Sequence, residues 1–323
     1  MRDVILRIKD VIEKSTSIAL TAHISEDEDA LGSLFALNET LKNIGKNSTV
    51  FLSRTLGKNM SFFKESYETD IPENPVFDLL ICLDCADIGR IDGRESLFEN
   101  AKTTVNIDHH FTNTNFADIN WVEGETSSTG EMLCSLIPAI SGFTKKTASY
   151  LYASIAGDTG CFKYSCVTPK TMCIAADLLR YDINHADIVK ELFDSEDINA
   201  VRLRAEIMRN IQSCYNGRVN IAVVDEELFQ RYGVDEKDIG GIVDIPRRIT
   251  GTEIAASFKI LRDKIKLSIR SGGRANVAEI AALFGGGGHK MAAGGTSTDD
   301  LQKTLDRFLQ GCETALDKIN KEI

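Results

Sequence analysis

The chain has 323 residues, of which 43% are hydrophobic, and a formal net charge of −11. Its length favours two domains, because a single hydrophobic core seldom organises more than about 250–300 residues. Residues 216–323 hold 16 basic and 16 acidic side chains, so the whole acidic excess lies in residues 1–215. This acidic body argues against tight binding of long duplex DNA, whose affinity comes mostly from neutralised phosphates. Small anions that are bound locally stay compatible with it.

The amino-terminal segment mixes apolar and charged residues. Residues 1–10 read Met-Arg-Asp-Val-Ile-Leu-Arg-Ile-Lys-Asp, which fits neither a signal peptide nor a membrane span. We therefore expect a cytoplasmic protein that makes no contact with a membrane. The eight cysteines are irregularly spaced, and we expect them to be reduced thiols. Cys82 and Cys85 form one C-x-x-C, but Cys82 lies in an apolar run, which favours a small buried side chain.

The first predicted strand, Ser17 to Ala22, is followed by an acidic turn and then by a helix. The helix is predicted by apolar residues at 30, 34, 37, 41 and 44, which recur every three or four positions. His23, Asp27 and Asp29 therefore lie in the turn between the strand and the helix. Taken alone, such a turn is more often a capped helix start with solvated carboxylates.

Two further apolar runs end in acidic or imidazole groups. Val76 to Leu83 has the nearly continuous apolar character of a buried parallel strand, and Asp84 follows it. Thr103 to Ile107 is a weaker copy that leads into Asp-His-His at 108–110. Strands that alternate with helical patterns indicate a doubly wound, mostly parallel α/β sheet, in which ligands collect beyond the carboxyl ends of the strands. All three runs deliver their polar residues to that edge.

The next segments are helical. Patterns at 131–140 and 148–155 precede Gly-Asp-Thr-Gly at 157–160, so Asp158 follows a helix rather than a strand. Thr168 and Pro169 predict another helix start, with a capping hydroxyl and a proline at the first helical position. We expect residues 1–195 to form the first domain and residues 196–215 to form a linker helix. Residues 216–323 are then a smaller α/β domain.

The second domain contains a predicted hairpin with strands at 253–261 and 264–270. Alternation places Lys264, Lys266, Ser268 and Arg270 on one face of its second strand. Residues 247–274 hold eight basic and two acidic side chains, the one strongly basic stretch of the sequence.

A helical pattern at 276–284 leads into four glycines at 285–288, followed by His289 and Lys290. The usual interpretation of such a tract is a mobile loop. Here we predict that it lies between two helical segments, so its backbone N–H groups can instead wrap a phosphate that His289 contacts. We favour this phosphate-binding interpretation.

Carboxylates and neutral imidazoles gathered at one sheet edge are the ligands that a pair of divalent cations requires. Asp84 and Asp158 are our candidates for bridging ligands, because a carboxylate with two oxygens spans two closely spaced ions. Such ions lower the pKa of a shared water and stabilise negative charge on an attacked phosphoryl group. Singly, each residue has a plainer explanation as a cap or a core histidine. The predicted ligands of one ion are His23 and Asp27, and those of the other are Asp29 and His109.

The polar motifs described above resemble, in this order, the DHH phosphoesterase superfamily. They are His23 with Asp27 and Asp29, then Asp84, then Asp-His-His at 108–110, and then Asp158. The superfamily is named for the triplet Asp108, His109 and His110. The run from Phe284 to Gly294 is similar to the DHH-associated substrate-binding domain. Together the two resemblances cover nearly the whole chain, and they are strongest to the NrnA-like group. One departure is that Glu26 stands where the first motif of the family usually has proline.

The resemblance implies two manganese ions, with magnesium as the alternative, held by the six ligands named above. It implies catalytic roles for Asp84 and Asp158 and places His110 near the scissile phosphate. It also implies that another phosphate of the substrate is bound by a set in the second domain: Arg270, Ser271, Gly286, Gly287, Gly288 and His289.

The expected activity is hydrolysis of short oligoribonucleotides to mononucleotides, and of 3'-phosphoadenosine 5'-phosphate (pAp) to AMP. In this scheme the first domain holds the metals and the second binds one end of the substrate. The nearest alternative is the same chemistry on cyclic di-AMP or on its linear product pApA. A nucleotide sensor that does not cleave is disfavoured, because every metal ligand is present. A homodimer stays compatible with the sequence.

Overall fold

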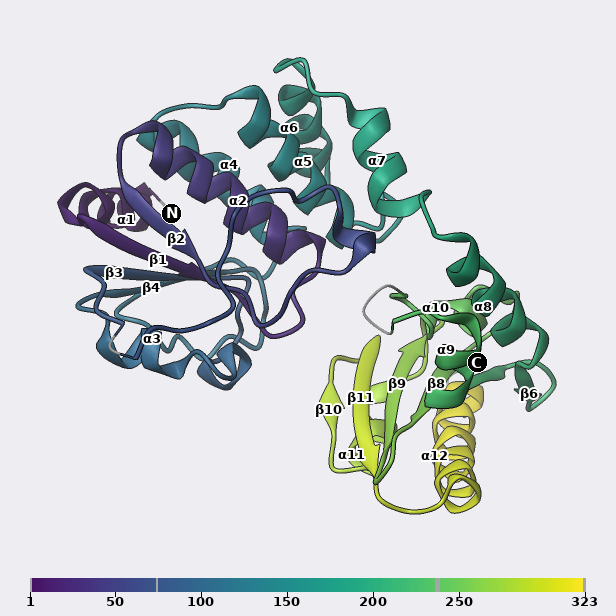
Figure 1. Ribbon diagram of the computed structural model, residues 1–323. Coiled ribbons are helices and arrows are strands. Elements are labelled where there is room, and N and C mark those ends of the chain that lie inside the picture. The colour runs from purple at the N-terminus through teal and green to yellow at the C-terminus, as the bar shows by residue number, and fades with distance from the viewer. Residues whose placement is uncertain (1, 74, 236–238, 322–323) are drawn as a thin grey trace. The chain divides into compact units, whose positions relative to one another are not determined.

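The computed structural model describes residues 2–73, 75–235 and 239–321 (Figure 1). The chain divides into two compact units, Met1–Ser195 and Glu196–Ile323, and each has its own sheet and its own hydrophobic cores. Across the described ranges, none of the helices combines the length and the apolar character needed to span a bilayer.

A parallel sheet forms the centre of the first unit. Within the described residues it has five strands in the order β2-β1-β3-β4-β5, all running in one direction. The carboxyl ends of these strands therefore lie along one edge, and the predicted α/β class is confirmed. The strands are β1 (Ser17–Thr21), β2 (Asn47–Val50), β3 (Leu79–Leu83), β4 (Thr104–Asp108) and β5 (Ile119–Val122).

Helices cover both faces of this sheet (Figure 1). One face packs on α1 (Arg2–Lys14), α2 (Glu28–Asn43), α4 (Thr129–Ile140) and α5 (Lys145–Asp158). The other face packs on η2 (Ile88–Ile91) and α3 (Glu95–Asn100). The remaining elements of this unit are η1 (Lys58–Met60), α6 (Pro169–Leu179) and α7 (His185–Phe193).

Strand β3 is apolar throughout because both of its faces are buried. Leu79, Ile81 and Leu83 enter the larger core, while Leu80 and Cys82 enter the smaller one. Cys82 is thus the buried small side chain that its apolar surroundings predicted.

The predicted limits of two elements can be compared with the structure. The strand predicted from Val76 begins only at Leu79, and Val76 is 64% exposed. Asp78 accounts for the later start, because its carboxylate accepts hydrogen bonds from the backbone N–H groups of Thr16 and Ser17. The predicted start of α6 is confirmed, with Thr168 as the capping residue and proline in the first turn.

Helices α2 and α5 pack against each other at glycines. A Cβ atom added to Gly32 would lie 2.6 Å from the Tyr150 carbonyl oxygen, and one added to Gly157 would lie 2.5 Å from the Glu28 Cβ atom. Any larger side chain at either position would push the two helices apart. The Gly157 contact joins the first turn of α2 to the last turn of α5, and the Gly32 contact joins α2 to the middle of α5.

The second unit contains a mixed sheet. Among the described residues its strand order is β10-β11-β9-β8-β7-β6, in which only β7 and β8 run parallel. The strands are β6 (Gln212–Cys214), β7 (Val219–Asp225), β8 (Ile254–Ile260), β9 (Ile265–Ser271), β10 (Gly287–Gly288) and β11 (Ala292–Ser297). The helices are α8 (Ile198–Arg209), α9 (Glu226–Tyr232), α10 (Asp244–Arg247), α11 (Val277–Ala282) and α12 (Leu301–Lys321).

The segment 196–215 packs within the second unit. Leu203 and Ile207 of α8 contribute to a core with Ala222 and Val224 of β7. Strand β6, at the end of the segment, pairs with β7.

The hairpin of β8 and β9 alternates as its sequence predicts. Ile265, Leu267 and Ile269 are buried in the core beneath α11 and α12, while Lys266 on the opposite face is exposed. The prediction for the glycine run is wrong in one respect. The segment that follows it is strand β11 rather than a helix, and Gly287 and Gly288 pair with Gly294 and Ala293 in β11.

The physical reason is steric. A Cβ atom at Gly286 would lie 1.9 Å from the Gly294 carbonyl oxygen, so only glycine permits this pairing.

Candidate metal centre

Polar side chains from four places in the sequence meet at the carboxyl edge of the first sheet. His23 follows β1, Asp84 follows β3 and His109 follows β4. Asp27 is the N-cap of α2 and accepts a hydrogen bond from the Ala30 backbone N–H. The other members are Asp29, in the first turn of α2, and Asp158, the last residue of α5.

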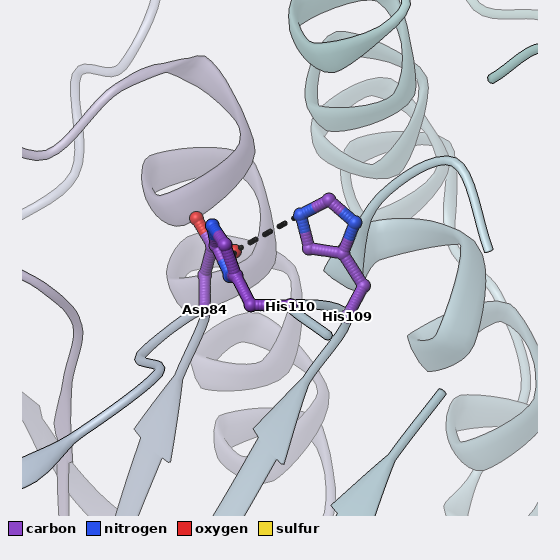
Figure 2. A group of neighbouring side chains, drawn as sticks. All are labelled: Asp84, His109 and His110. Carbon is purple, nitrogen blue, oxygen red and sulfur yellow. Dashed lines mark ion pairs between the residues drawn. The ribbon is translucent and has the colours of Figure 1, made fainter. Parts of the chain in front are cut away.

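Asp84 lies at the centre of this group. Its Oδ2 atom is 3.3 Å from His23 Nε2, and its Oδ1 atom is 3.5 Å from His109 Nε2. Figure 2 shows the His109 imidazole directed at the Asp84 carboxylate. Asp84 has a backbone φ of +54°, a left-handed conformation that aspartate adopts more readily than most residues. Such strain is typical of functional positions, where the surrounding structure holds it in place.

The remaining carboxylates complete the arrangement around the two histidines. His23 Nε2 is 3.7 Å from Asp27 Oδ1, while His109 Nε2 is 3.0 Å from Asp158 Oδ2 and 3.8 Å from Asp29 Oδ2. Within the described residues, three overlapping sets place their ligand atoms within 4.8 Å of one another. They are His23 with Asp27 and Asp84, Asp29 with His109 and Asp158, and Asp84 with His109 and His110.

All six side chains predicted to hold metals are therefore brought together, and their donor chemistry suits hard divalent cations. His110 joins them, because its Nδ1 atom is 3.6 Å from Asp84 Oδ1. Sequence reasoning placed His110 near the substrate and did not include it among the ligand sets.

Backbone carbonyls orient the two histidines that face Asp84. His23 Nδ1 lies 2.8 Å from the Ile24 carbonyl oxygen, and His109 Nδ1 lies 3.3 Å from the Thr126 carbonyl oxygen. A proton on Nδ1 satisfies each carbonyl and turns Nε2 toward the carboxylates, which is how metal-binding histidines are commonly held.

His110 is oriented by a buried carboxylate instead. Its Nδ1 atom is 2.7 Å from Asp108 Oδ1, and Asn113 donates a 2.6 Å hydrogen bond to Asp108 Oδ2. Asp108 is fully buried, so its geometry is fixed by these two partners. The sequence indicated Asp108 only as part of the triplet, and neither its role toward His110 nor that of Asn113 was predicted.

Asp29 is also fully buried and is held from four directions. The backbone N–H groups of Thr129 and Gly130, at the start of α4, donate to its two oxygens at 2.8 and 3.1 Å. The Ser33 and Ser154 hydroxyls donate to Oδ1. A Cβ atom at Gly130 would collide with Ser154 Oγ, so glycine is required there.

The crowding of carboxylates shifts the pKa values of the whole group. Burial lowers the pKa of His23, but the Asp27 and Asp84 carboxylates outweigh it and raise that pKa to about 11. For His109, burial is outweighed by Asp158, Asp84 and Asp29, and its pKa also rises to about 11. Burial raises the pKa of Asp29 and Asp158, and the charges of neighbouring carboxylates raise it further.

Asp84 behaves in the opposite way. Burial acts to raise its pKa, but the hydrogen bond and positive charge of His23, with the charges of His109 and His110, bring it well below the usual range. Protons thus offset the negative charge of the metal-free cluster. A bound cation would do the same and displace them.

Glu26, the residue in place of proline, points away from this cluster. It accepts a 2.9 Å hydrogen bond from Arg94 Nη1 and hydrogen bonds of 2.5 and 2.7 Å from the Ser53 N–H and hydroxyl. Glu26 and Arg94 are 3% and 2% exposed, so the extra charge is neutralised locally. The turn that carries Asp27 is therefore anchored by an ion pair, and the six ligands are unaffected.

The residues predicted to bind a phosphate lie in the second unit. Arg270 and Ser271 end strand β9, and the Ser271 N–H donates to the Met291 carbonyl oxygen. His289 closes the turn between β10 and β11 through reciprocal backbone hydrogen bonds with Ala292. Gly286, Gly287 and Gly288 precede it in the same hairpin. The backbone thus brings the predicted substrate-binding residues to the β10–β11 side of this sheet.

Family models match both units. Residues 17–155 match the DHH family, N-terminal domain, and residues 216–318 match the DHHA1 domain. This chain combines a DHH domain with a DHHA1 domain. The triplet at 108–110 is the one that gives this family of phosphoesterases its name.

Relatives of this DHH protein extend over nearly its full length. The bifunctional oligoribonuclease and PAP phosphatase NrnA of Bacillus subtilis is 28% identical over 92% of this chain and 94% of its own. A crystal structure of an exopolyphosphatase-related protein from Bacteroides fragilis has a TM-score of 0.90 at 24% identity, covering 97% of this chain and 96% of that one. The structure of exonuclease RecJ bound to manganese has a TM-score of 0.55 at 15% identity, covering 95% and 92%.

Proposed function

We propose that this DHH protein is a two-metal phosphoesterase that hydrolyses short oligoribonucleotides to mononucleotides and pAp to AMP. The observation that carries the proposal is the convergence of three overlapping ligand sets on Asp84 and His109 at one sheet edge. The substrate assignment is supported by the full-length similarity to the B. subtilis oligoribonuclease and PAP phosphatase. A cytoplasmic location is part of the proposal.

In this proposal His23, Asp27 and Asp84 hold one divalent cation, while Asp29, His109 and Asp158 hold the other. Asp84 lies within reach of both histidines, and this supports its role as a bridging ligand. Manganese is the preferred ion, because a transition metal accepts imidazole as well as carboxylate donors, and magnesium, which favours oxygen ligands, is the alternative. When bound, the cations would supply Lewis acidity and an activated water molecule.

We assign the proton donor of the reaction to His110. Asp108 holds the Nδ1 proton, so Nε2 is the atom that serves the leaving oxygen. Burial lowers the pKa of His110, but its hydrogen bond to Asp108 and the charges of Asp84 and Asp108 raise it overall. This raised pKa favours the imidazolium form, which can donate a proton.

Recognition of another substrate phosphate is assigned to Arg270, Ser271 and the glycine hairpin, which is the β10–β11 hairpin with His289 in its turn. Gly287, Gly288 and His289 are exposed, and the hairpin pairs with β9, whose outward face carries basic residues. Phosphate contacts of this kind carry no base preference, so substrate length would matter more than sequence.

The decisive experiment is a substrate panel with manganese and with magnesium. The purified protein is incubated with an RNA dinucleotide, an RNA of about 24 nucleotides, pAp, cyclic di-AMP and linear pApA. The two RNA lengths test whether short substrates are preferred to long ones. We expect metal-dependent release of mononucleotides from the dinucleotide and of AMP from pAp. Preferential cleavage of cyclic di-AMP would replace the substrate assignment, and absence of any turnover would overturn the proposal.

A further inference from the structure

A cavity of about 440 Å³ lies in the first unit, within the size range of small-ligand pockets. It lies between the loop that follows β5 and the amino-terminal turn of α6. The residues that line it are Glu123, Gly124, Glu125, Thr126, Glu131, Thr168 and Lys170.

The cavity shares a wall with the candidate metal centre. The Thr126 carbonyl oxygen lies 3.3 Å from His109 Nδ1, and the Glu123 N–H donates a 3.1 Å hydrogen bond to the Asp108 carbonyl oxygen. Two residues of the cavity lining, Thr126 and Glu123, therefore contact two members of the DHH triplet, His109 and Asp108, directly.

The charge of the lining excludes a phosphate as its occupant. Three glutamates face one lysine, and the ammonium of Lys170 is 3.2 Å from Glu131 Oε1. The other oxygen of Glu131 accepts hydrogen bonds from the Ser127 and Thr171 hydroxyls, so this buried carboxylate is rigidly held. A lining rich in fixed acceptors suits a neutral group that carries hydrogen-bond donors, such as hydroxyl or amino groups.

An aromatic ring, that of Phe111, packs against Gly124 of the cavity lining. Phe111 follows the DHH triplet directly and is 77% exposed. A Cβ atom added to Gly124 would lie 2.4 Å from Cδ1 of this ring, so the ring lies directly against Gly124. Single exposed apolar residues are common, but this one is placed by a glycine of the cavity wall and adjoins His110. Exposed aromatic rings are common stacking platforms for nucleobases.

We propose that this cavity, with the Phe111 ring, is the nucleoside subsite for the residue next to the scissile phosphate. The base stacks on Phe111, while its amino groups or the ribose hydroxyls donate to the glutamates of the lining. This inference rests on the proposed nucleotide substrate, and it adds which part of the nucleotide is recognised beside the metals. Recognition by stacking accepts any of the bases, as turnover of mixed short RNA requires.

The kinetic test compares Phe111→Ala with the wild-type enzyme on an RNA dinucleotide and on two analogues, each lacking one base. We expect KM for the intact dinucleotide to rise about tenfold with little change in kcat, because one base-stacking contact is lost. The effect should vanish on the analogue that lacks the stacked base and should be reversed by Phe111→Trp. Val76→Ala, another exposed apolar position of this unit, is the matched control.

A binding test does not depend on turnover. Trp121 is the single tryptophan of the chain and donates a 2.8 Å hydrogen bond to Glu123, so its fluorescence reports on the cavity. We expect adenosine to change this signal saturably, Phe111→Ala to weaken adenosine about tenfold, and inorganic phosphate to have no effect.

Adenosine binding without hydrolysis of any dinucleotide would overturn the proposed function while supporting the subsite. Equal KM values for Phe111→Ala and wild type on every analogue, or no adenosine signal, would overturn the subsite itself.

Discussion

Two regions of the molecule are held in place by opposite means. One is the candidate metal centre at the carboxyl edge of the first sheet, called the metal edge below, and the other is the glycine hairpin of the second unit. At the metal edge each donor is fixed by other side chains, as Asp29 is by two serines and two backbone N–H groups. In the hairpin the backbone itself is the structural element, and its positions are defined by the absence of side chains. A site that positions metal ions depends on side-chain networks, whereas a backbone site depends on close approach. The two should therefore respond differently to substitution.

The largest expected effect comes from the centre of the metal edge. Asp84→Asn should lower metal-dependent hydrolysis by about a thousandfold or more, because it removes a shared charge from both ligand sets. Asparagine tolerates the left-handed backbone of this position, so circular dichroism should show an unchanged fold. The control is Asp78→Asn, just before the same strand at its opposite end, which should keep full activity. Wild-type turnover in the Asp84 variant would contradict the metal assignment.

A smaller loss is expected where a carboxylate acts through a histidine. Asp108→Asn keeps the shape of the residue but weakens its hold on His110, so kcat should fall about 10–100-fold. The pH profile should also change, because the pKa of His110 is raised partly by Asp108. An unaltered profile would show that Asp108 has only a packing role.

Metal uptake should depend on pH. Burial lowers the pKa of His23 and His109, but nearby carboxylates raise it to about 11 in the metal-free protein, so both imidazoles are protonated at neutral pH. Each must lose its proton to bind a cation, and manganese affinity should rise by up to about tenfold per pH unit for each proton released. Calorimetry in buffers of different ionisation enthalpy measures this release.

The same shifts determine the stability of the metal-free protein. A raised folded-state pKa means that the two imidazolium groups stabilise the fold fully below about pH 6.5. That contribution is lost as the pH rises toward 11. Thermal unfolding of the metal-free protein should therefore move to lower temperature across this interval, and a flat response would contradict the protonated state.

The smallest effect tests the glycine hairpin. Gly286→Ala places a methyl group against the Gly294 carbonyl oxygen, so the β10–β11 pairing should be disturbed and KM should rise about fivefold. Gly240→Ala, in the same unit but outside the hairpin, is the matched control, because no atom lies within 4 Å of its added Cβ. Equal KM values for the two variants would separate the hairpin from substrate binding.

The sequence was informative about the metal edge because parallel strands bring their carboxyl ends together. Once β1, β3 and β4 were recognised as strands, the positions of His23, Asp84 and His109 followed from topology. Contacts between distant segments carried no such signal. Nothing local to Ser154 or Arg94 indicates that they hold Asp29 and Glu26, respectively.

The glycine run illustrates a different limit of sequence reasoning. Four consecutive glycines lack the alternating side chains by which a strand is recognised, so β10 could not be predicted. Its pairing with β11 depends on the close approach of two backbones, a tertiary property.

The glycine contact between α2 and α5 sets a limit on which ions the first unit can accommodate. Asp27 and Asp29 belong to the start of one helix and Asp158 to the end of the other, and Gly32 and Gly157 let the two helices pack with no side chain between them. We therefore expect the spacing of these three donors to follow from the packing of the two helices, which makes ionic radius a criterion for selection. Calcium, with bonds of about 2.3–2.6 Å against about 2.0–2.1 Å for magnesium, would require the donors to lie further apart.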